Sequence, residues 1–393
     1  MVCDTIVVRK DRPFSSTYQI LCPNPYFYSP FCTITLYKIG KIHTPQVMFS
    51  YENKAVPLPP KSLNYYLFYM KHYLLCAVAL MCNYAMAQKV DYSVVYVPQE
   101  SGIQFTRMTS DNDMVCMPIV KRTRQGVGWL SNRILDISLD NTQLAYLSAR
   151  NGMTNIFIKN IQQQGSSRQR TNRQNVLDFS YSPDGQKIVF SEQSGKQNQI
   201  FQTDAENGYV CRQITSGNQD YSPVYSVDKK QIFFTRQENN GSNIWSYSVE
   251  NNFLSNYTRG MNPCPLSDGK SVLCARMNAE GRSEIWRIDY TTSVEECIVS
   301  DPHKSFTTPS ISPDGKWILM VGSSEIATEA FSYWNTDIYV CRIDGSQLSQ
   351  LTYHAADDLS PAWSRDGGYI FFISQRGSAT ATANVWMMNF AVE

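Results

Sequence analysis

The side chains in this sequence that could do chemistry are mainly aspartates, because histidines are scarce. Only His303 and His354 follow residue 87, and two histidines cannot supply the three or four convergent ligands of a zinc centre. The sequence also has neither a Gly-x-Ser-x-Gly nucleophile elbow nor a phosphate-binding glycine loop before a helix. These features argue against a hydrolase, a zinc enzyme and a nucleotide-binding enzyme.

Six aspartates lie on or just before strands that we expect to line a central channel. Such carboxylates could bind a hard cation. In the alternative interpretation, which we prefer, they accept hydrogen bonds from backbone N–H groups and hold the loops in place. The six are Asp113, Asp136, Asp178, Asp220, Asp357 and Asp358.

Polar and aromatic residues also gather in three stretches between expected strands, at 216–221, 301–308 and 353–359. Binding residues are often found on loops that a rigid scaffold holds, so we expect one mouth of the channel to receive a protein or peptide. The alternative is that these loops only seal the junctions between neighbouring units. A lengthened loop with Phe331, Tyr333 and Trp334 is a second candidate contact surface. The candidate binding residues of the mouth are Asp220, Tyr221, His303, Phe306, Tyr353, His354, Asp357 and Asp358.

The elements that must position these residues form a repeat. Six turns centred on an aspartate follow one another at spacings of 44, 44, 40, 46 and 52 residues. Each turn precedes an apolar strand and then a third strand with a polar, a β-branched and an aromatic residue, such as Asn155-Ile156-Phe157. A period of about 40–45 residues with several short strands is typical of propeller blades. The turn residues with an expected structural role are Asp140, Asp184, Gly185, Asp228, Asp268, Gly269, Asp314, Gly315, Asp366 and Gly367.

The last blade runs out of chain before its fourth strand, and Thr106-Arg107-Met108-Thr109 upstream can supply it. The sequence therefore predicts an all-β, six-bladed β-propeller over residues 101–390, closed by an N-terminal strand that joins the last blade. Closure of this kind removes an exposed sheet edge.

The front of the chain has a different character. Residues 70–87 read as a signal peptide, with Lys71, an apolar run of signal-peptide length and Ala85-Met86-Ala87 before Gln88. A lipoprotein signal using Cys82 and a membrane-spanning or buried helix are the alternatives. Because a signal peptide must be N-terminal, we interpret residues 1–69 as an upstream extension or a disordered segment.

The phrases Ser182-Pro183-Asp184-Gly185 and Ser312-Pro313-Asp314-Gly315, and the longer stretch from Gln350 to Gly367, resemble the WD-like repeat of TolB-type propellers. The resemblance covers about residues 103–390. It implies a periplasmic propeller that binds the lipoprotein Pal at the channel mouth, although the separate N-terminal domain of TolB is absent. Similar repeats occur in relatives of prolyl oligopeptidase, which also need a hydrolase domain that this chain lacks. They occur as well in oligogalacturonate lyase, whose His-rich metal site this chain also lacks.

We therefore expect a periplasmic or secreted, non-enzymatic protein- or peptide-binding scaffold of the cell envelope. An envelope protein such as a Pal-like lipoprotein is the expected partner, without cofactor, metal or stable membrane span, and the mature chain is expected to be a monomer. The net charge of +1 gives no basic stripe for nucleic acid. The alternative is a carbohydrate-active or lyase-type propeller enzyme with a metal in the channel. Cys264 and Cys274 flank one hairpin, and a disulfide between them is left open.

Overall fold

The structure, a computed structural model, describes residues 92–118, 133–163, 165–239, 241–327 and 332–391, together with the backbone of 121–123, 126–128 and four N-terminal strands. The chain divides into two compact units, residues 1–88 and 89–393. In the first unit, β1 (Ser16–Ile20), β2 (Cys32–Leu36), β3 (Val47–Tyr51) and β4 (Lys54–Pro57) form an antiparallel sheet that we did not predict. The expected signal segment 70–87 lies outside the described residues.

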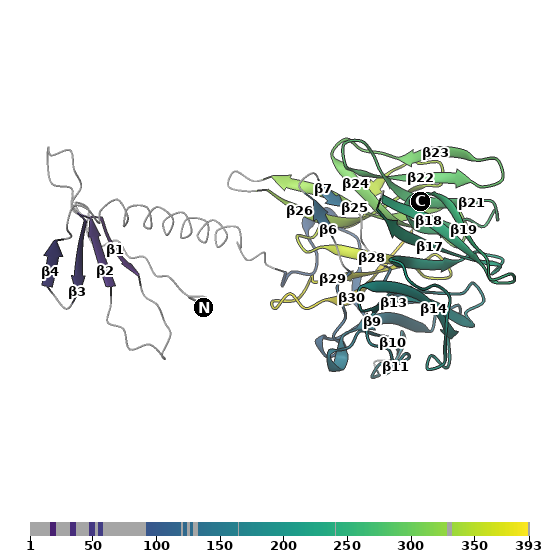
Figure 1. Cartoon of the computed structure of the whole chain (residues 1–393), viewed down its shortest axis with the longest axis horizontal. Helices are drawn as coiled ribbons and strands as arrows, with labels where there is room; N and C mark the ends of the chain where they lie inside the picture. The colour runs from purple at the N-terminus through teal and green to yellow at the C-terminus, as the bar shows by residue number, and fades with distance from the viewer. Residues whose placement is uncertain are drawn as a thin grey trace. The chain divides into compact units, whose positions relative to one another are not determined.

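The second unit confirms the predicted six-bladed all-β propeller (Figure 1). Six four-stranded antiparallel sheets follow one another in chain order, and the described residues contain no helix long and apolar enough to cross a membrane. Blade 1 holds β8 (Leu135–Ile137), β9 (Gln143–Ser148), β10 (Asn155–Asn160) and β11 (Arg168–Gln169). Blade 2 holds β12 (Val176–Tyr181), β13 (Lys187–Ser194), β14 (Gln197–Asp204) and β15 (Cys211–Gln213). Blade 3 holds β16 (Asp220–Tyr225), β17 (Gln231–Glu238), β18 (Gly241–Ser248) and β19 (Leu254–Arg259).

The remaining blades repeat the pattern. Blade 4 holds β20 (Met261–Pro265), β21 (Ser271–Met277), β22 (Ser283–Asp289) and β23 (Val294–Val299). Blade 5 holds β24 (Lys304–Ile311), β25 (Trp317–Ala327), β26 (Ser332–Arg342) and β27 (Ser349–Gln350). Blade 6 holds β28 (Asp358–Trp363), β29 (Tyr369–Ser374) and β30 (Asn384–Asn389). A separate hairpin, β6 (Lys121–Thr123) and β7 (Gly126–Gly128), precedes blade 1, and its β7 lies beside β24 and β25.

Strand β5 (Phe105–Arg107) closes the ring as predicted. It pairs antiparallel with β30, with Arg107 opposite Trp386 and Phe105 opposite Met388. The fourth strand of the last blade thus comes from the chain before the first blade.

The repeated triplet of the third strands has a packing explanation. In all six blades the central β-branched residue is 0% exposed, because it faces the neighbouring blade. These residues are Ile156, Ile200, Ile244, Ile285, Ile338 and Val385. The apolar core is accordingly divided among the interfaces between blades, where burial of such side chains stabilises the fold.

The aspartate turns also share one geometry. In the fifth blade Ser312 Oγ donates to Asp314 Oδ1 at 2.6 Å, and Gly315 has φ +73°. The left-handed conformation recurs one residue after the aspartate in all six turns, and a glycine occupies it in four of them. Glycine adopts this conformation without steric cost.

The innermost strands carry a second repeated feature that the sequence analysis missed. Ser222, Asn262, Thr308 and Ser360 each precede a proline, have φ between +51° and +54°, and lie at a β-bulge. The bulge frees backbone N–H groups for the previous blade, so that Asn262 N donates to Thr235 Oγ1 at 2.9 Å. The recurring dipeptide of Ser, Thr or Asn followed by Pro could have indicated these bulges in the sequence.

The cysteine pair left open above is reduced. Cys264 pairs with Leu273 across the hairpin, so Cys274 points to the opposite face of the sheet. Both are free thiols.

Candidate functional site

The strand order places the three loops at one end of the propeller. Each loop joins the outermost strand of one blade to the innermost strand of the next, β15 to β16, β23 to β24 and β27 to β28. The tip of the β25–β26 hairpin lies at the same end, since second and third strands are also joined there. We call this end the mouth face.

Beneath the mouth face, Asp220 forms a buried ion pair. Its carboxylate accepts two hydrogen bonds from Arg236, at 2.7 Å from Nε and 3.0 Å from Nη2. The Arg236 guanidinium stacks on Trp245, with its Cζ 4.4 Å from the ring centroid. Asp220 is 0% exposed and therefore anchors the start of β16 instead of contacting a ligand.

Asp358 belongs to a second buried charge cluster. Arg376, which is 0% exposed, donates to Asp358 Oδ2 at 2.5 Å and to both carboxylate oxygens of Glu100 at 3.0 and 3.1 Å. Burial, followed by the charge of Asp358, raises the pKa of nearby Asp337 to about 9. A raised pKa favours the neutral form of Asp337, which limits the uncompensated negative charge beside Asp358.

The loop before β28 is fixed by its own polar groups. His354 is 0% exposed, its Nδ1 accepts a hydrogen bond from Ala356 N at 2.8 Å, and its carbonyl accepts one from Asn335 Nδ2 at 2.8 Å. Asp357 accepts hydrogen bonds from Thr336 N at 3.1 Å and Oγ1 at 2.8 Å. His354 is thus part of the loop's internal structure and does not present its ring to solvent.

Four of the eight predicted binding residues keep accessible surface on the mouth face, namely Tyr353, His303, Tyr221 and the half-buried Asp357. Tyr353 is 39% exposed, while its backbone N donates to Glu100 Oε1 at 2.8 Å. His303 is exposed, and Tyr221 is half-buried. Phe306 is 0% exposed and packs edge-to-face on Tyr339, which removes it from the contact surface.

The competing surface on blade 5 is only partly described. Tyr333 and Trp334 are half-buried on β26, opposite Ile326 and Glu325. Phe331 lies outside the described residues.

Asp136 and Asp178 accept hydrogen bonds from backbone N–H groups, as in the interpretation that we preferred, whereas Asp220 and Asp358 pair with arginine side chains. Asp136 Oδ2 accepts a hydrogen bond from Tyr181 N, and Asp178 Oδ2 one from Ser222 N, each at 2.9 Å and each in the next blade. Burial raises the pKa of Asp178 to about 6, although the hydrogen bonds from Ser191 and Ser222 act to lower it. Within the described part of the chain, no three His, Cys, Asp or Glu side chains converge as metal ligands would.

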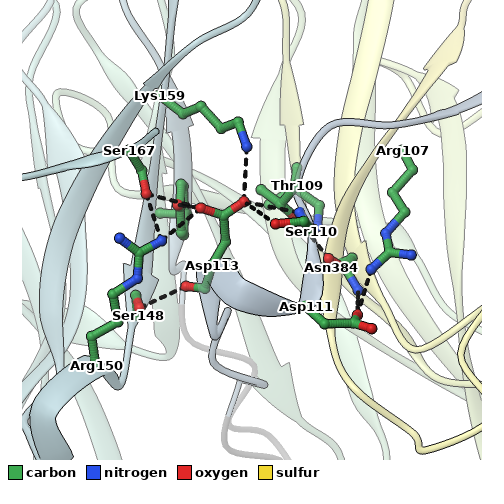
Figure 2. A network of polar contacts seen from close by, with 12 residues as sticks. Arg107, Thr109, Ser110, Asp111, Asp113, Ser148, Arg150, Lys159, Ser167 and Asn384 are labelled. Carbon is green, nitrogen blue, oxygen red and sulfur yellow. Dashed lines mark hydrogen bonds and ion pairs between the residues drawn. The ribbon is translucent and has the colours of Figure 1, made fainter. Parts of the chain in front are cut away.

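Asp113 lies in a network that the sequence analysis did not assemble (Figure 2). Its carboxylate accepts hydrogen bonds from Arg150 Nη2 at 2.6 Å, Lys159 Nζ at 2.8 Å and Ser167 Oγ at 2.9 Å, all on blade 1. Tyr146 OH and Ser110 N also donate, at 3.0 and 2.9 Å. Burial alone would raise the pKa of Asp113, but these hydrogen bonds, that of Lys159 foremost, outweigh burial and hold it well below its usual range.

A large hollow opens beside this network, between the outer strands of blades 6 and 1. Its volume is about 1180 Å³, and we call it the closure pocket. Its lining combines β5, the segment up to Asp113, and the stretch from Lys159 to Ser167. Only the spacing of Ser110 and Asp113, typical of a capping box, hinted at this site in the sequence.

Comparisons with known proteins agree with this fold. The family "TolB beta propeller domain" matches residues 136–301. The putative TolB from Agrobacterium tumefaciens is 17% identical with a TM-score of 0.51, over 68% of this chain and 94% of that protein. TolB from Acinetobacter baumannii is 17% identical with a TM-score of 0.50, over 64% of each chain. Oligogalacturonate lyase from Vibrio parahaemolyticus is 12% identical with a TM-score of 0.49, over 76% of this chain and 96% of the lyase.

Proposed function

We propose that this chain, a six-bladed propeller whose residues 136–301 match the TolB beta propeller domain, is an exported, non-enzymatic scaffold of the cell envelope that binds a protein or peptide at its mouth face. The observation that carries the proposal is the way in which this face is built. Tyr221, His303 and Tyr353 are accessible there, and hydrogen bonds fix the backbone at or next to each of them: Ser222 N donates to Asp178, His303 N to Asp301 and Tyr353 N to Glu100.

Rigid loops favour binding because little conformational entropy is lost when a partner docks. The Asp220–Arg236 pair lies directly under Tyr221, and Glu100 of the second cluster bonds the backbone of Tyr353. Tyrosines are enriched among the residues that dominate interface energies. A partner that spans the mouth would contact blades 3 and 6, which stand opposite each other in a ring of six.

Export rests on the sequence of residues 70–87, which has the charged start, apolar run and Ala85-Met86-Ala87 site of a signal peptide. In this proposal the mature chain begins near Gln88, is monomeric, and meets an envelope partner such as a Pal-like lipoprotein. N-terminal sequencing of the mature protein tests the cleavage. A mature chain that retains residues before Met70 would contradict it.

The binding proposal is tested by capture from envelope extracts with paired variants. We expect Tyr221→Ala combined with Tyr353→Ala to abolish capture, since truncating a central aromatic anchor costs about 2 kcal/mol or more. Tyr369→Ala is the matched control, because Tyr369 is 43% exposed but starts β29, at the opposite end of the propeller. Unchanged capture by the double variant, with loss in Trp334→Ala, would move the binding surface to the β25–β26 hairpin.

A further inference from the structure

The closure pocket lies between blades 6 and 1, where the ring closes, and has a volume of about 1180 Å³. Its lining comes from β5, from the connection between β5 and β8, from Arg150 between β9 and β10, and from the end of β10 with the chain that follows it. The β5–β8 and β9–β10 connections reach the mouth face, so the pocket borders that face at the junction of blades 6 and 1. Its lining contains none of Tyr221, His303 and Tyr353.

The lining of the pocket is suited to a polar ligand. Hydroxyl, amide and charged side chains predominate, and the lining contains no aromatic residue. The few apolar groups are those of Met108 and Ile161. Polar and apolar atoms share the lining surface about equally, so hydrogen bonds and charge must decide which ligand binds.

The charges of the lining leave a positive excess. Arg107, Arg150 and Lys159 face only two carboxylates, those of Asp111 and Asp113. Arg150 and Lys159 share the single carboxylate of Asp113, as Figure 2 shows. One positive charge beside Asp113 is therefore without a counter-ion among the lining residues.

Arg150 also has N–H groups that make no hydrogen bond within the described part of the chain. Its Nη2 makes both of its hydrogen bonds, at 2.6 Å to Asp113 and 2.6 Å to Ser167. Its Nη1 makes no hydrogen bond among the described residues, whereas its Nε is buried and out of reach of a ligand. The guanidinium is held in place over the ring of Phe157, 4.7 Å from the centroid. A fixed guanidinium with unused donors matches the oxygens of a carboxylate or phosphate.

We propose that the closure pocket binds an oxyanion, a carboxylate or phosphate group, through Arg150 with Arg107 and Lys159 around it. The anion supplies the missing counter-charge, and the surrounding Ser, Thr, Asn and Gln side chains bond to its polar substituents. The same chemistry could come from a free small anion or from an acidic stretch of a protein. This site shares no residue with the proposed mouth-face contacts Tyr221, His303 and Tyr353.

The test titrates the full chain with two probes, inorganic phosphate and a tetraglutamate peptide, by calorimetry at low and at physiological ionic strength. We expect saturable one-site binding that weakens with salt. Binding of phosphate identifies a free anion as the source, and binding of the peptide alone identifies an acidic segment; both support the pocket. No saturable binding of either probe would overturn the proposal, as would a tetraglutamine peptide that binds as tightly as tetraglutamate.

Variants locate the site without disturbing Asp113. Gln163→Glu adds a negative charge to the pocket lining at an exposed residue, and should weaken binding roughly fivefold or more. Gln197→Glu makes the same change at an exposed residue that does not line the pocket, and should leave binding unchanged. Arg107→Gln removes a cation of the lining and should also weaken binding. Equal weakening by Gln163→Glu and Gln197→Glu would show an effect of net charge alone, and the assignment to the pocket would be wrong.

Discussion

Replacing Asp113 by Asn tests whether its network locks the ring. Asp113 is 3% exposed and lies six residues after β5, on the segment that runs from the last blade to the first. The substitution removes the counter-charge of Arg150 and Lys159, whose side chains are 25% and 13% exposed. Breaking a buried ion pair from one side costs about 3–5 kcal/mol. We expect a loss of about 3 kcal/mol in the free energy of unfolding, at the lower end because the amide keeps one acceptor oxygen.

The pH dependence follows from the lowered pKa of Asp113. A carboxyl group whose pKa is lower in the folded chain than in the unfolded chain stabilises the fold fully above its unfolded pKa, about 3.9. That stabilisation is lost as the pH falls towards the folded value. The difference in unfolding free energy between wild type and Asp113→Asn should thus be constant from about pH 7 to pH 5 and shrink below about pH 4.

Denaturant unfolding of both proteins at several pH values measures this difference. Asp111→Asn is the control, because Asp111 is on the same segment but its carboxylate is 59% exposed and pairs with Arg107 at the surface. Surface pairs contribute about 0–1 kcal/mol, so the control should lose little. A loss below about 1 kcal/mol for Asp113→Asn, or a difference that does not change down to about pH 3, would refute the reasoning.

Three further predictions concern the repeat, the ring and a thiol. Gly315→Val should destabilise the protein by roughly 1–3 kcal/mol in denaturant melts, because φ is +73° there. The added Cβ itself would meet only Ser267 Oγ, at an ordinary contact of 3.6 Å, so the cost comes from the backbone. A neutral result would contradict this. Deleting residues 88–110 removes β5 and Glu100, so that β30 gains an open edge and Arg376 loses a partner. We expect the truncated protein to aggregate in sedimentation experiments. A monomer with an unchanged melting temperature would contradict this prediction. Partial burial and the Glu284 carboxylate raise the pKa of Cys297 to about 11. Iodoacetamide should therefore alkylate Cys297 slowly at neutral pH, and faster in the variant Glu284→Gln. Equal alkylation rates in wild type and variant would count against the role of Glu284.

The blade architecture could be predicted because the same local pattern recurs six times. A turn such as Pro313-Asp314-Gly315 and a triplet such as Asp337-Ile338-Tyr339 depend on backbone conformation and on burial of one β-branched residue, and both can be seen within a few residues. The closing strand could be predicted because the last blade was one strand short. These arguments need no knowledge of distant contacts.

The candidate sites were harder because they depend on contacts between distant segments. His354 and Asp358 have the residue types of a binding site, yet one bonds its own loop and the other pairs with Arg376. Asp113 meets Lys159 across 46 residues. Composition and spacing indicate which loops share the mouth face, but only packing decides which of their side chains are buried.

The origin of β5 has a consequence for biosynthesis. Its partner β30 lies about 280 residues further along the chain. At about 5–20 residues per second, a ribosome finishes β30 roughly a quarter of a minute to a minute after β5. During that time the earlier blades can stack on one another, but the nascent ring stays open, with β5 unpaired. A chain that ended at Ala383 would lack β30 altogether, and β5 would have no strand to pair with, so that five finished blades would still lack closure.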